Sequence, residues 1–186
     1  PDYTKAQLQK KIDKRLDKDT KRVDTLFSTM VNVQEYHIDW DQDPTHHALL
    51  FRSFLKSGLE SWRDTLTHLA LHIPLEHLAT LARITLPALC TFNIQFTTLA
   101  LSLREINIYL DGFMVFLHNL KDTLTSLSIS SNPRSEHLDL SRFFRYLGSF
   151  PHLREMGLKI PFDGGQLSDP HTLCNFIARH THTLRS

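Results

Sequence analysis

Residues 124–129 read Leu-Thr-Ser-Leu-Ser-Ile, and the prediction of the fold begins from the spacing of their three apolar residues. We call the first apolar residue of this frame its anchor. Because the last three positions alternate between apolar and polar, the frame predicts a β-strand with its apolar side chains on one face. Complete copies of the frame have their anchors at Val33, Leu66, Leu89 and Leu153, and a sixth copy begins at Leu184 and stops at Ser186.

The copies alternate between two types, which together form a unit of about 60 residues. The first type follows a Thr-Leu step, and its anchors are Leu66, Leu124 and Leu184. The second type has an apolar residue three positions before its anchor, as at Met30, Leu86 and Phe150. A recurring period of this kind predicts stacked repeats that bury one continuous core.

Segments with helical spacing precede the strands of the first type, and they contain Phe54-Leu55, Phe116-Leu117 and Phe176-Ile177. Asp43-Pro44 and Asp169-Pro170 supply an N-cap acceptor followed by proline in the first turn. Asp111-Gly112 stands in the equivalent place and predicts a helix that begins near Phe113. Strand–helix–strand units this short predict an α/β fold with parallel strands and right-handed crossovers.

Residues 103–108, Leu-Arg-Glu-Ile-Asn-Ile, also match the frame, but they lie only 14 residues after Leu89. That distance is too short for a full repeat of at least about 20 residues. We therefore interpret the segment 101–110 as an extra strand or an extended loop.

Composition indicates one globular domain or one short repeat array, since 41% of the 186 residues are hydrophobic and 22% are charged. A net charge of +1 argues against a nucleic-acid partner, and the apolar runs are far shorter than the roughly 20 residues that cross a bilayer. Two cysteines, Cys90 and Cys174, form no disulfide framework, and we expect both to be buried, inert thiols. With no signal peptide recognised, the expected location is intracellular, cytoplasmic or nuclear.

Residues 1–24 hold eight Lys or Arg and five Asp or Glu, with Leu8, Ile12 and Leu16 at helical spacing. We expect a charged amphipathic helix that is part of the repeat array of residues 25–186 or caps it. Charges of both signs favour a solvated helix over a membrane-binding one, and no membrane contact is predicted.

Because of these repeated frames, the sequence resembles the leucine-rich-repeat family, and most closely the irregular repeats of fungal F-box/leucine-rich-repeat proteins. The residues that carry the resemblance are Val31–Val33 with Tyr36–Trp40, the Thr-Leu-Thr-x-Leu steps at 65–69 and 123–127, and Phe150–Arg154. The resemblance implies a horseshoe-shaped solenoid with a parallel sheet on its concave face and helices on its convex face.

The sequence departs from that family in two ways. The usual Asn or Cys three positions after the third apolar residue is present only as Asn132, while Pro74, Thr97 and Pro161 stand there in other copies, so we expect irregular turns. No F-box is recognised in residues 1–30. The resemblance therefore implies contact with a ubiquitin ligase scaffold only through an F-box outside this chain, and we interpret the array as truncated at its C-terminus.

Alternation along each strand predicts which residues face the concave surface, because apolar positions face the core. Concave parallel sheets of repeat proteins commonly bind other proteins. The predicted partner-binding residues are Glu35, His37, Asp39, His68, Ala70, His72, Thr91, Asn93, Gln95, Ser126, Ser128, Ser130, Glu155, Gly157 and Lys159.

Twelve histidines raise the alternative of a metal site. None of the candidate groups has the paired ligand spacing of a zinc site, and no catalytic motif is present, so we predict no metal, no cofactor and no catalytic residue. The candidate groups are His46-His47, His68 with His72 and His37, and His171 with Cys174 and His180.

The sequence thus predicts a non-enzymatic protein–protein interaction module that resembles the substrate-recognition repeats of an F-box-type ubiquitin ligase receptor. Two alternatives remain open at this point. One is a metal-dependent hydrolase that uses the histidines, and the other is a truncated fragment with no independent function, which would expose apolar surface and a strand edge.

Overall fold

The computed structural model describes residues 5–40, 44–97, 101–131, 138–161 and 165–185, with residue 6 and residues 44–50 described by their backbone alone. Its five strands form one sheet in the order β1-β2-β3-β4-β5, and every neighbouring pair is parallel. This confirms the predicted α/β class and the parallel sheet. The strands are β1 (Glu35–Asp39), β2 (His68–Pro74), β3 (Thr91–Thr97), β4 (Ser126–Ser131) and β5 (Glu155–Lys159).

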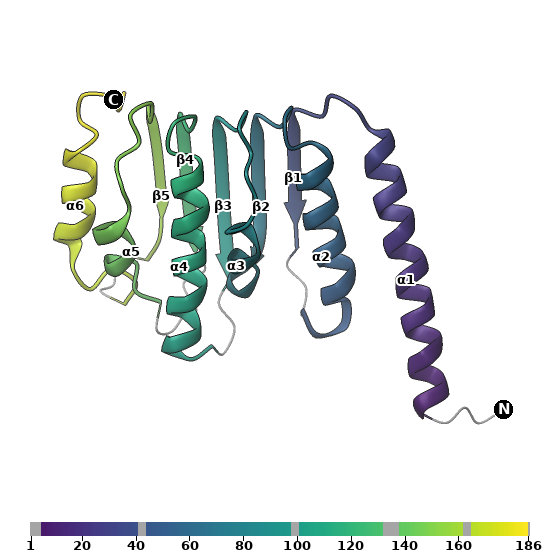
Figure 1. The fold of residues 1–186 in the computed structure, drawn as a ribbon. Coiled ribbons are helices and arrows are strands. Elements are labelled where there is room, and N and C mark those ends of the chain that lie inside the picture. Colours follow the sequence, from purple (N-terminus) through teal and green to yellow (C-terminus); the bar gives the residue numbers. More distant parts are fainter. Residues whose placement is uncertain (1–4, 41–43, 98–100, 132–137, 162–164, 186) are drawn as a thin grey trace.

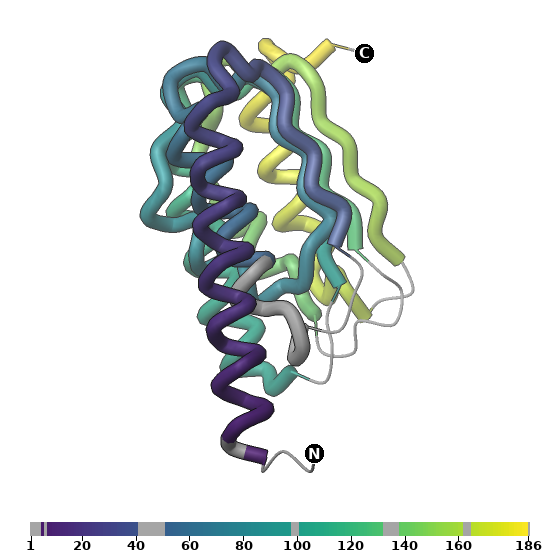
Figure 2. Tube along the Cα trace, turned by 90° about the vertical axis from the view of Figure 1, so that its right-hand side faces the viewer, coloured from purple at the N-terminus to yellow at the C-terminus, as the bar shows by residue number. Residues whose placement is uncertain are grey.

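The helices lie together on one side of the sheet (Figure 1). A view along the sheet separates the two layers, with the strands on one side and the helices on the other (Figure 2). The helical elements are α1 (Lys5–Thr29), α2 (Pro44–Ser61), the 3₁₀ turn η1 (Leu75–His77), α3 (Leu78–Leu81), α4 (Leu103–Asn119), α5 (Ser141–Tyr146) and α6 (Pro170–Ala178).

The strand register brings the same position of every frame into one row. The second apolar residues pair from strand to strand as Tyr36, Leu69, Phe92, Leu127 and Met156. The third apolar residues form a parallel row that runs from Ile38 to Leu158. The anchors Leu66, Leu89, Leu124 and Leu153 are fully buried two residues before their strands, and Val33, the anchor of the first copy, is half-buried. The predicted row of anchors and strands is therefore confirmed.

The Thr-Leu step of the first frame type forms a hydrogen-bonded turn at the end of a helix. Thr65, Thr123 and Thr183 each donate the backbone N–H to the carbonyl three residues earlier, at 3.1, 3.1 and 2.9 Å. The anchor that follows donates to the same carbonyl at 2.9 Å in all three copies. The hydroxyls of Thr123 and Thr183 donate to the same carbonyl, whereas the Thr65 hydroxyl lies closer to the carbonyl of Val33, at 2.8 Å. Threonine recurs there because its hydroxyl adds a donor to a carbonyl at a helix end.

The second frame type enters its strand through a tighter turn. Leu89 donates its N–H to Leu86 at 3.1 Å, and Leu153 donates to Phe150 at 3.2 Å. Both acceptor residues are buried. The apolar residue three positions before the anchor is therefore the first residue of a turn that closes onto the core.

The interpretation of residues 101–110 as a strand or loop was wrong, because this segment begins α4. Ser102 caps the helix by accepting from the N–H of Glu105, whose carboxylate accepts from the N–H of Ser102, so the two form a capping box. The hydrogen bonds with the Ser102 side chain and backbone lower the pKa of Glu105. Leu103 and Ile108, which the strand frame needed in the core, are 58% and 52% exposed.

The buried residues of α4 instead follow the helical period, through Ile106, Leu110, Phe113 and Leu117. The prediction of a helix start at Asp111-Gly112 was also wrong, since both residues lie inside α4. Asp111 pairs with Arg142 of α5 at 3.0 Å. The start signal at Asp169-Pro170 is confirmed, because the Asp169 carboxylate caps α6. Helix α2 begins at Pro44, as predicted, while Asp43 lies outside the described residues.

Helix α1 runs through the charged segment and on to Thr29, and its second half packs beside α2. Phe27 is the buried residue of α1, with ring centroids 4.8 Å from Trp62 and 5.6 Å from Phe54. Leu8 and Ile12, in the first half, are exposed. Among the described residues, no helix combines the length and the apolar character needed to span a membrane.

Helix α4 comes close to α3 at Gly112. A Cβ atom at this position would lie 2.8 Å from the Cα of Ala79, which is a backbone atom and cannot rotate away. Glycine is thus required by the packing of the two helices, in spite of its low helix propensity.

We expect Gly112→Ala to lower the free energy of unfolding by about 1–2 kcal/mol, because the clash outweighs the gain in helix propensity. Urea denaturation monitored by circular dichroism measures the change. Val115→Ala in the exposed part of the same helix is the matched control and should change stability by less than about 0.5 kcal/mol. A Gly112→Ala protein more stable than the parent would contradict the close packing.

His77 is buried at the end of the 3₁₀ turn, with its ring 4.3 Å from that of Phe51. Burial, together with the positive charge of Arg52, lowers the pKa of His77 to about 4. Because the unfolded chain binds this proton near the ordinary pKa of 6.5, protonation favours unfolding between pH 6.5 and about 4.

We expect the free energy of unfolding to fall as the pH drops through this window. His77 should contribute up to about 1.4 kcal/mol of this decrease for each pH unit. His77→Leu should flatten this part of the stability–pH profile, measured by urea denaturation at half-unit steps. The exposed His152→Leu serves as control and should leave the profile unchanged. Identical slopes in the parent and His77→Leu would show that His77 does not titrate in this way.

Candidate functional site

The candidate site is the face of the sheet opposite the helices, which we call the open face. No described helix lies on it (Figure 2). The fifteen predicted partner-binding residues all fall on this face, and the register aligns them in three cross-strand rows. The rows are Glu35-His68-Thr91-Ser126-Glu155, His37-Ala70-Asn93-Ser128-Gly157 and Asp39-His72-Gln95-Ser130-Lys159.

Carboxylates and the lysine of the open face occur only on the two outer strands. Glu35 and Asp39 lie on β1, whereas Glu155 and Lys159 lie on β5. The three central strands present hydroxyls, amides, Ala70 and two histidines. Since neighbouring strands lie about 4.8 Å apart, this distribution keeps like-charged carboxylates from standing side by side.

A shallow groove of about 150 Å³ crosses the middle of the open face, lined by His37, Ala70, His72, Asn93, Gln95, Ser128 and Ser130 with the backbone of Leu71 and Ile94. At its edge the Nδ1 of His72 lies 2.7 Å from a carboxylate oxygen of Asp39. The Nε2 of His72 is buried and has no hydrogen-bond partner in the structure. The groove therefore offers the side-chain amides of Asn93 and Gln95 and serine hydroxyls for hydrogen bonding to a partner, whereas both ring nitrogens of His72 are either paired or buried.

The middle row of the open face ends at Gly157 on β5, which has no side chain. A Cβ atom there would lie 3.0 Å from the hydroxyl of Ser128. Ala70 and Gly157 are the two residues of this row with the smallest side chains, so they project least from the sheet. The small residues of this row therefore lie on β2 and on the outer strand β5, with Asn93 and Ser128 between them.

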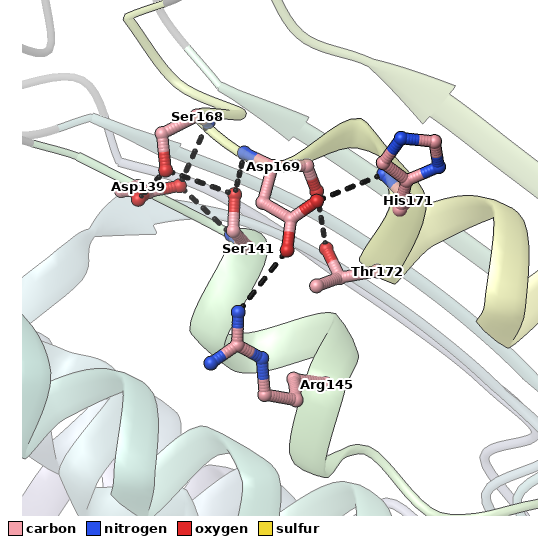
Figure 3. Close-up of polar contacts among 7 residues, drawn as sticks. All are labelled: Asp139, Ser141, Arg145, Ser168, Asp169, His171 and Thr172. Atoms are coloured by element: carbon pink, nitrogen blue, oxygen red, sulfur yellow. Dashed lines mark hydrogen bonds and ion pairs between the residues drawn. The ribbon is translucent and has the colours of Figure 1, made fainter.

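A second polar cluster lies where α5 meets α6 (Figure 3). Asp139 accepts hydrogen bonds from the backbone N–H groups of Ser141 and Ser168, at 2.9 and 3.2 Å, and from the Ser168 hydroxyl. Asp169 accepts from the backbone N–H of His171 and pairs with Arg145 at 3.1 Å. Serine, histidine and aspartate are thus close together.

This cluster is not arranged as a catalytic triad. Its histidine takes part through the backbone N–H, and the Ser141 hydroxyl accepts a hydrogen bond from the backbone N–H of Asp169 at 2.8 Å. These contacts cap α6 and join it to α5. We therefore assign the cluster a structural role, and no sequence motif pointed to it because Asp139 and Ser168 are far apart in the chain.

The histidine and cysteine groups proposed as metal ligands do not assemble. Within the part of the chain that the structure describes, no group of three or more His, Cys, Asp or Glu side chains could hold a metal ion. His37, His68 and His72 share the open face, whereas His180 is buried and His171 exposed. The side chains of His46 and His47 lie outside the described residues.

The two cysteines differ in environment. Cys90 is half-buried directly before β3, with its Sγ 3.3 Å from the carbonyl oxygen of Ala88. The expectation of a buried Cys174 was wrong, because this thiol is exposed on α6. Its neighbour Leu173 is the buried residue, and one step along a helix turns the next side chain by about 100° toward solvent.

Comparison with protein-family models, with curated proteins and with solved structures found no match to this chain.

The carboxylate of Asp139 makes the free energy of unfolding depend on pH in the acid range. Burial opposes its ionisation, but the hydrogen bonds from Ser141 and Ser168 outweigh burial and lower its pKa. A carboxyl group of this kind stabilises the fold fully above its unfolded pKa of about 3.9, and the contribution is lost as the pH falls through the folded value.

We expect Asp139→Asn to cost about 1–2 kcal/mol at pH 7, because the amide group cannot satisfy all three donors. The difference from the parent should shrink as the pH falls below about 4, measured by urea denaturation. Exposed Asp122→Asn is the control. A difference between parent and Asp139→Asn that stays constant from pH 7 to pH 3 would contradict a role for the carboxylate charge.

Proposed function

We propose that the chain is a non-enzymatic protein-interaction module whose open face binds a protein partner. The observation that carries this proposal is the alignment of fifteen polar or small residues in three rows on a sheet face that no described helix covers. Under this proposal the array is a leucine-rich-repeat-like solenoid, and the open face is its concave surface.

The placement of these side chains suits recognition. They project from strands whose other face is packed into the core, since Leu69, Phe92 and Leu127 are at most 1% exposed. Side chains on such rigid elements lose little conformational freedom on binding. The charged outer strands and the neutral groove also give a partner a distinct pattern of hydrogen bonds and charges to match.

The size of the face limits how a partner binds. Five strands at about 4.8 Å spacing and five residues along each strand make an area of roughly 19 by 14 Å. A standard interface buries about 800 Å² on each partner. The partner therefore also contacts segments that border the open face, or binds as a short segment with modest affinity.

The resemblance to F-box-type receptors suggests a specific class of role, in which the bound protein is the substrate of a ubiquitin ligase. That role requires an F-box outside this chain to reach the ligase scaffold. The repeat phase and the strand register support the repeat architecture, and the open face supports a protein partner. The ligase role itself is supported by the sequence resemblance.

We expect the combined variant His68→Arg, Asn93→Arg and Ser128→Glu to abolish capture of the partner, with the arginine at 68 placed beside Glu35 of β1. The three positions lie on β2, β3 and β4, and opposite charges at 93 and 128 avoid repulsion between neighbouring strands. Affinity capture from cells with quantitative mass spectrometry compares the parent with the variant. Thermal unfolding should change little, because all three side chains point away from the core.

A matched control carries the same charges on the helical side, as Ser61→Arg, Thr80→Glu and Asn119→Arg at exposed positions of α2, α3 and α4. Proteins that the parent and the control capture, but the open-face variant does not, are the partners of this face. Equal capture by all three proteins would remove the open face as the binding site.

A further inference from the structure

The third cross-strand row of the open face ends in two opposite charges. Asp39 lies at one end on β1, and Lys159 lies at the other end on β5. The strand register connects them through His72, Gln95 and Ser130. Since β1 and β5 are four strand intervals apart in the sheet (Figure 1), a spacing of about 4.8 Å per interval separates the two charged positions by roughly 19 Å.

Both charges are accessible to a partner. The Asp39 side chain is 69% exposed, and its Oδ1 lies 2.7 Å from the Nδ1 of His72. A carboxylate accepts hydrogen bonds at both oxygens, so the second oxygen of Asp39 can still accept from a cationic group. Lys159 is exposed and makes no ion pair with a described residue.

The other carboxylates of the open face preserve this contrast. Glu35 lies on β1 together with Asp39, and that strand carries no Lys or Arg. Glu155 lies four residues before Lys159 on β5, which is about 13 Å along an extended strand and exceeds the screening length of about 8 Å at physiological salt. The β1 end of the third row is therefore acidic, and its β5 end is basic.

The groove between these ends suits an extended main chain. Asn93 and Gln95 are exposed on β3, and each side-chain amide combines donors with an acceptor, as a peptide group does. These two amides can therefore bond to the C=O and N–H groups of a chain that crosses the strands. The groove has a volume of only about 150 Å³, so it accepts small side chains. An α-helix, which is about 10 Å wide, is too broad to enter it.

We propose that the open face binds an extended peptide that crosses the strands, with a basic residue at Asp39 and an acidic residue six positions away at Lys159. This inference rests on the proposed function and specifies the partner. An extended chain rises about 3.3 Å per residue, so six residues span about 20 Å, which matches the separation of the two charges. Because side chains alternate along such a chain, both charged residues face the sheet, and the two positions between them on that side must be small.

Two synthetic peptides test the proposal with the full chain. The probe is the blocked peptide Arg-Ser-Ala-Thr-Ala-Ser-Asp, in which the charges are six positions apart. The control, Ala-Ser-Arg-Thr-Asp-Ser-Ala, has the same composition and net charge, but its charges are two positions apart. We expect NMR titration of the isotope-labelled protein to show saturable shifts of the β2, β3 and β4 amides with the probe. The control should bind at least about threefold more weakly, because it can form at most one of the two ion pairs.

Protein variants test the two ends of the row separately. Lys159→Glu should weaken the probe by at least about threefold, and a probe with Arg in place of its Asp should recover the loss. The double variant Glu35→Gln and Asp39→Asn should weaken the probe to a similar degree, but it should not weaken a probe with Gln in place of its Arg. Lys14→Glu makes the same charge change at an exposed position of α1, and this control should bind the probe like the parent.

Two outcomes would overturn the inference and leave the proposed function standing. One is equal affinity of the probe and the control peptide for the open face, which would show that the face binds peptides without distinguishing the spacing of their charges. The other is the absence of saturable shifts when the variant with changes at 68, 93 and 128 still loses its cellular partners, which would assign the face to a folded partner. Equal cellular capture by that variant and the parent counts against the proposed function itself, so the two failures are distinguishable.

Discussion

The structure depends on the parallel register that places equivalent residues of successive frames side by side. A single strand of five to seven residues cannot bury its apolar face alone, so each row of apolar side chains is covered only because neighbouring strands and the helix layer enclose it. The two turn types serve this requirement. Both turn types place an anchor leucine in the core just before a strand begins. In the first type the turn follows a helix, and in the second type it is a tighter turn.

The same register creates the open face. On the open face, it converts alternate positions of five separate segments into three continuous rows. After β5, Arg185 donates its N–H to Arg154, as Arg154 donates to Thr125 one repeat earlier. The rows of the open face and this backbone contact therefore follow from one periodic arrangement.

The sequence predicted the five strands and the direction of their side chains, but it assigned residues 103–108 to the wrong element. Leu103, Ile106 and Ile108 fit a strand frame and, in part, a helical period, because a separation of three residues occurs in both patterns. The capping box between Ser102 and Glu105 is the local signal that favours the helix, and it lies in the sequence itself. The cluster around Asp139 had no such local signal, since its members come together only when α5 packs on α6.

The sequence by itself determined the repeat phase, the strands and the fifteen residues of the open face, because alternation and spacing are local properties that every copy repeats. Only the tertiary structure decided that Gly112 packs directly against Ala79, and that Cys174 faces solvent while His77 is buried. These features depend on distances between segments far apart in the chain, and such distances exist only after the helices have packed against the sheet.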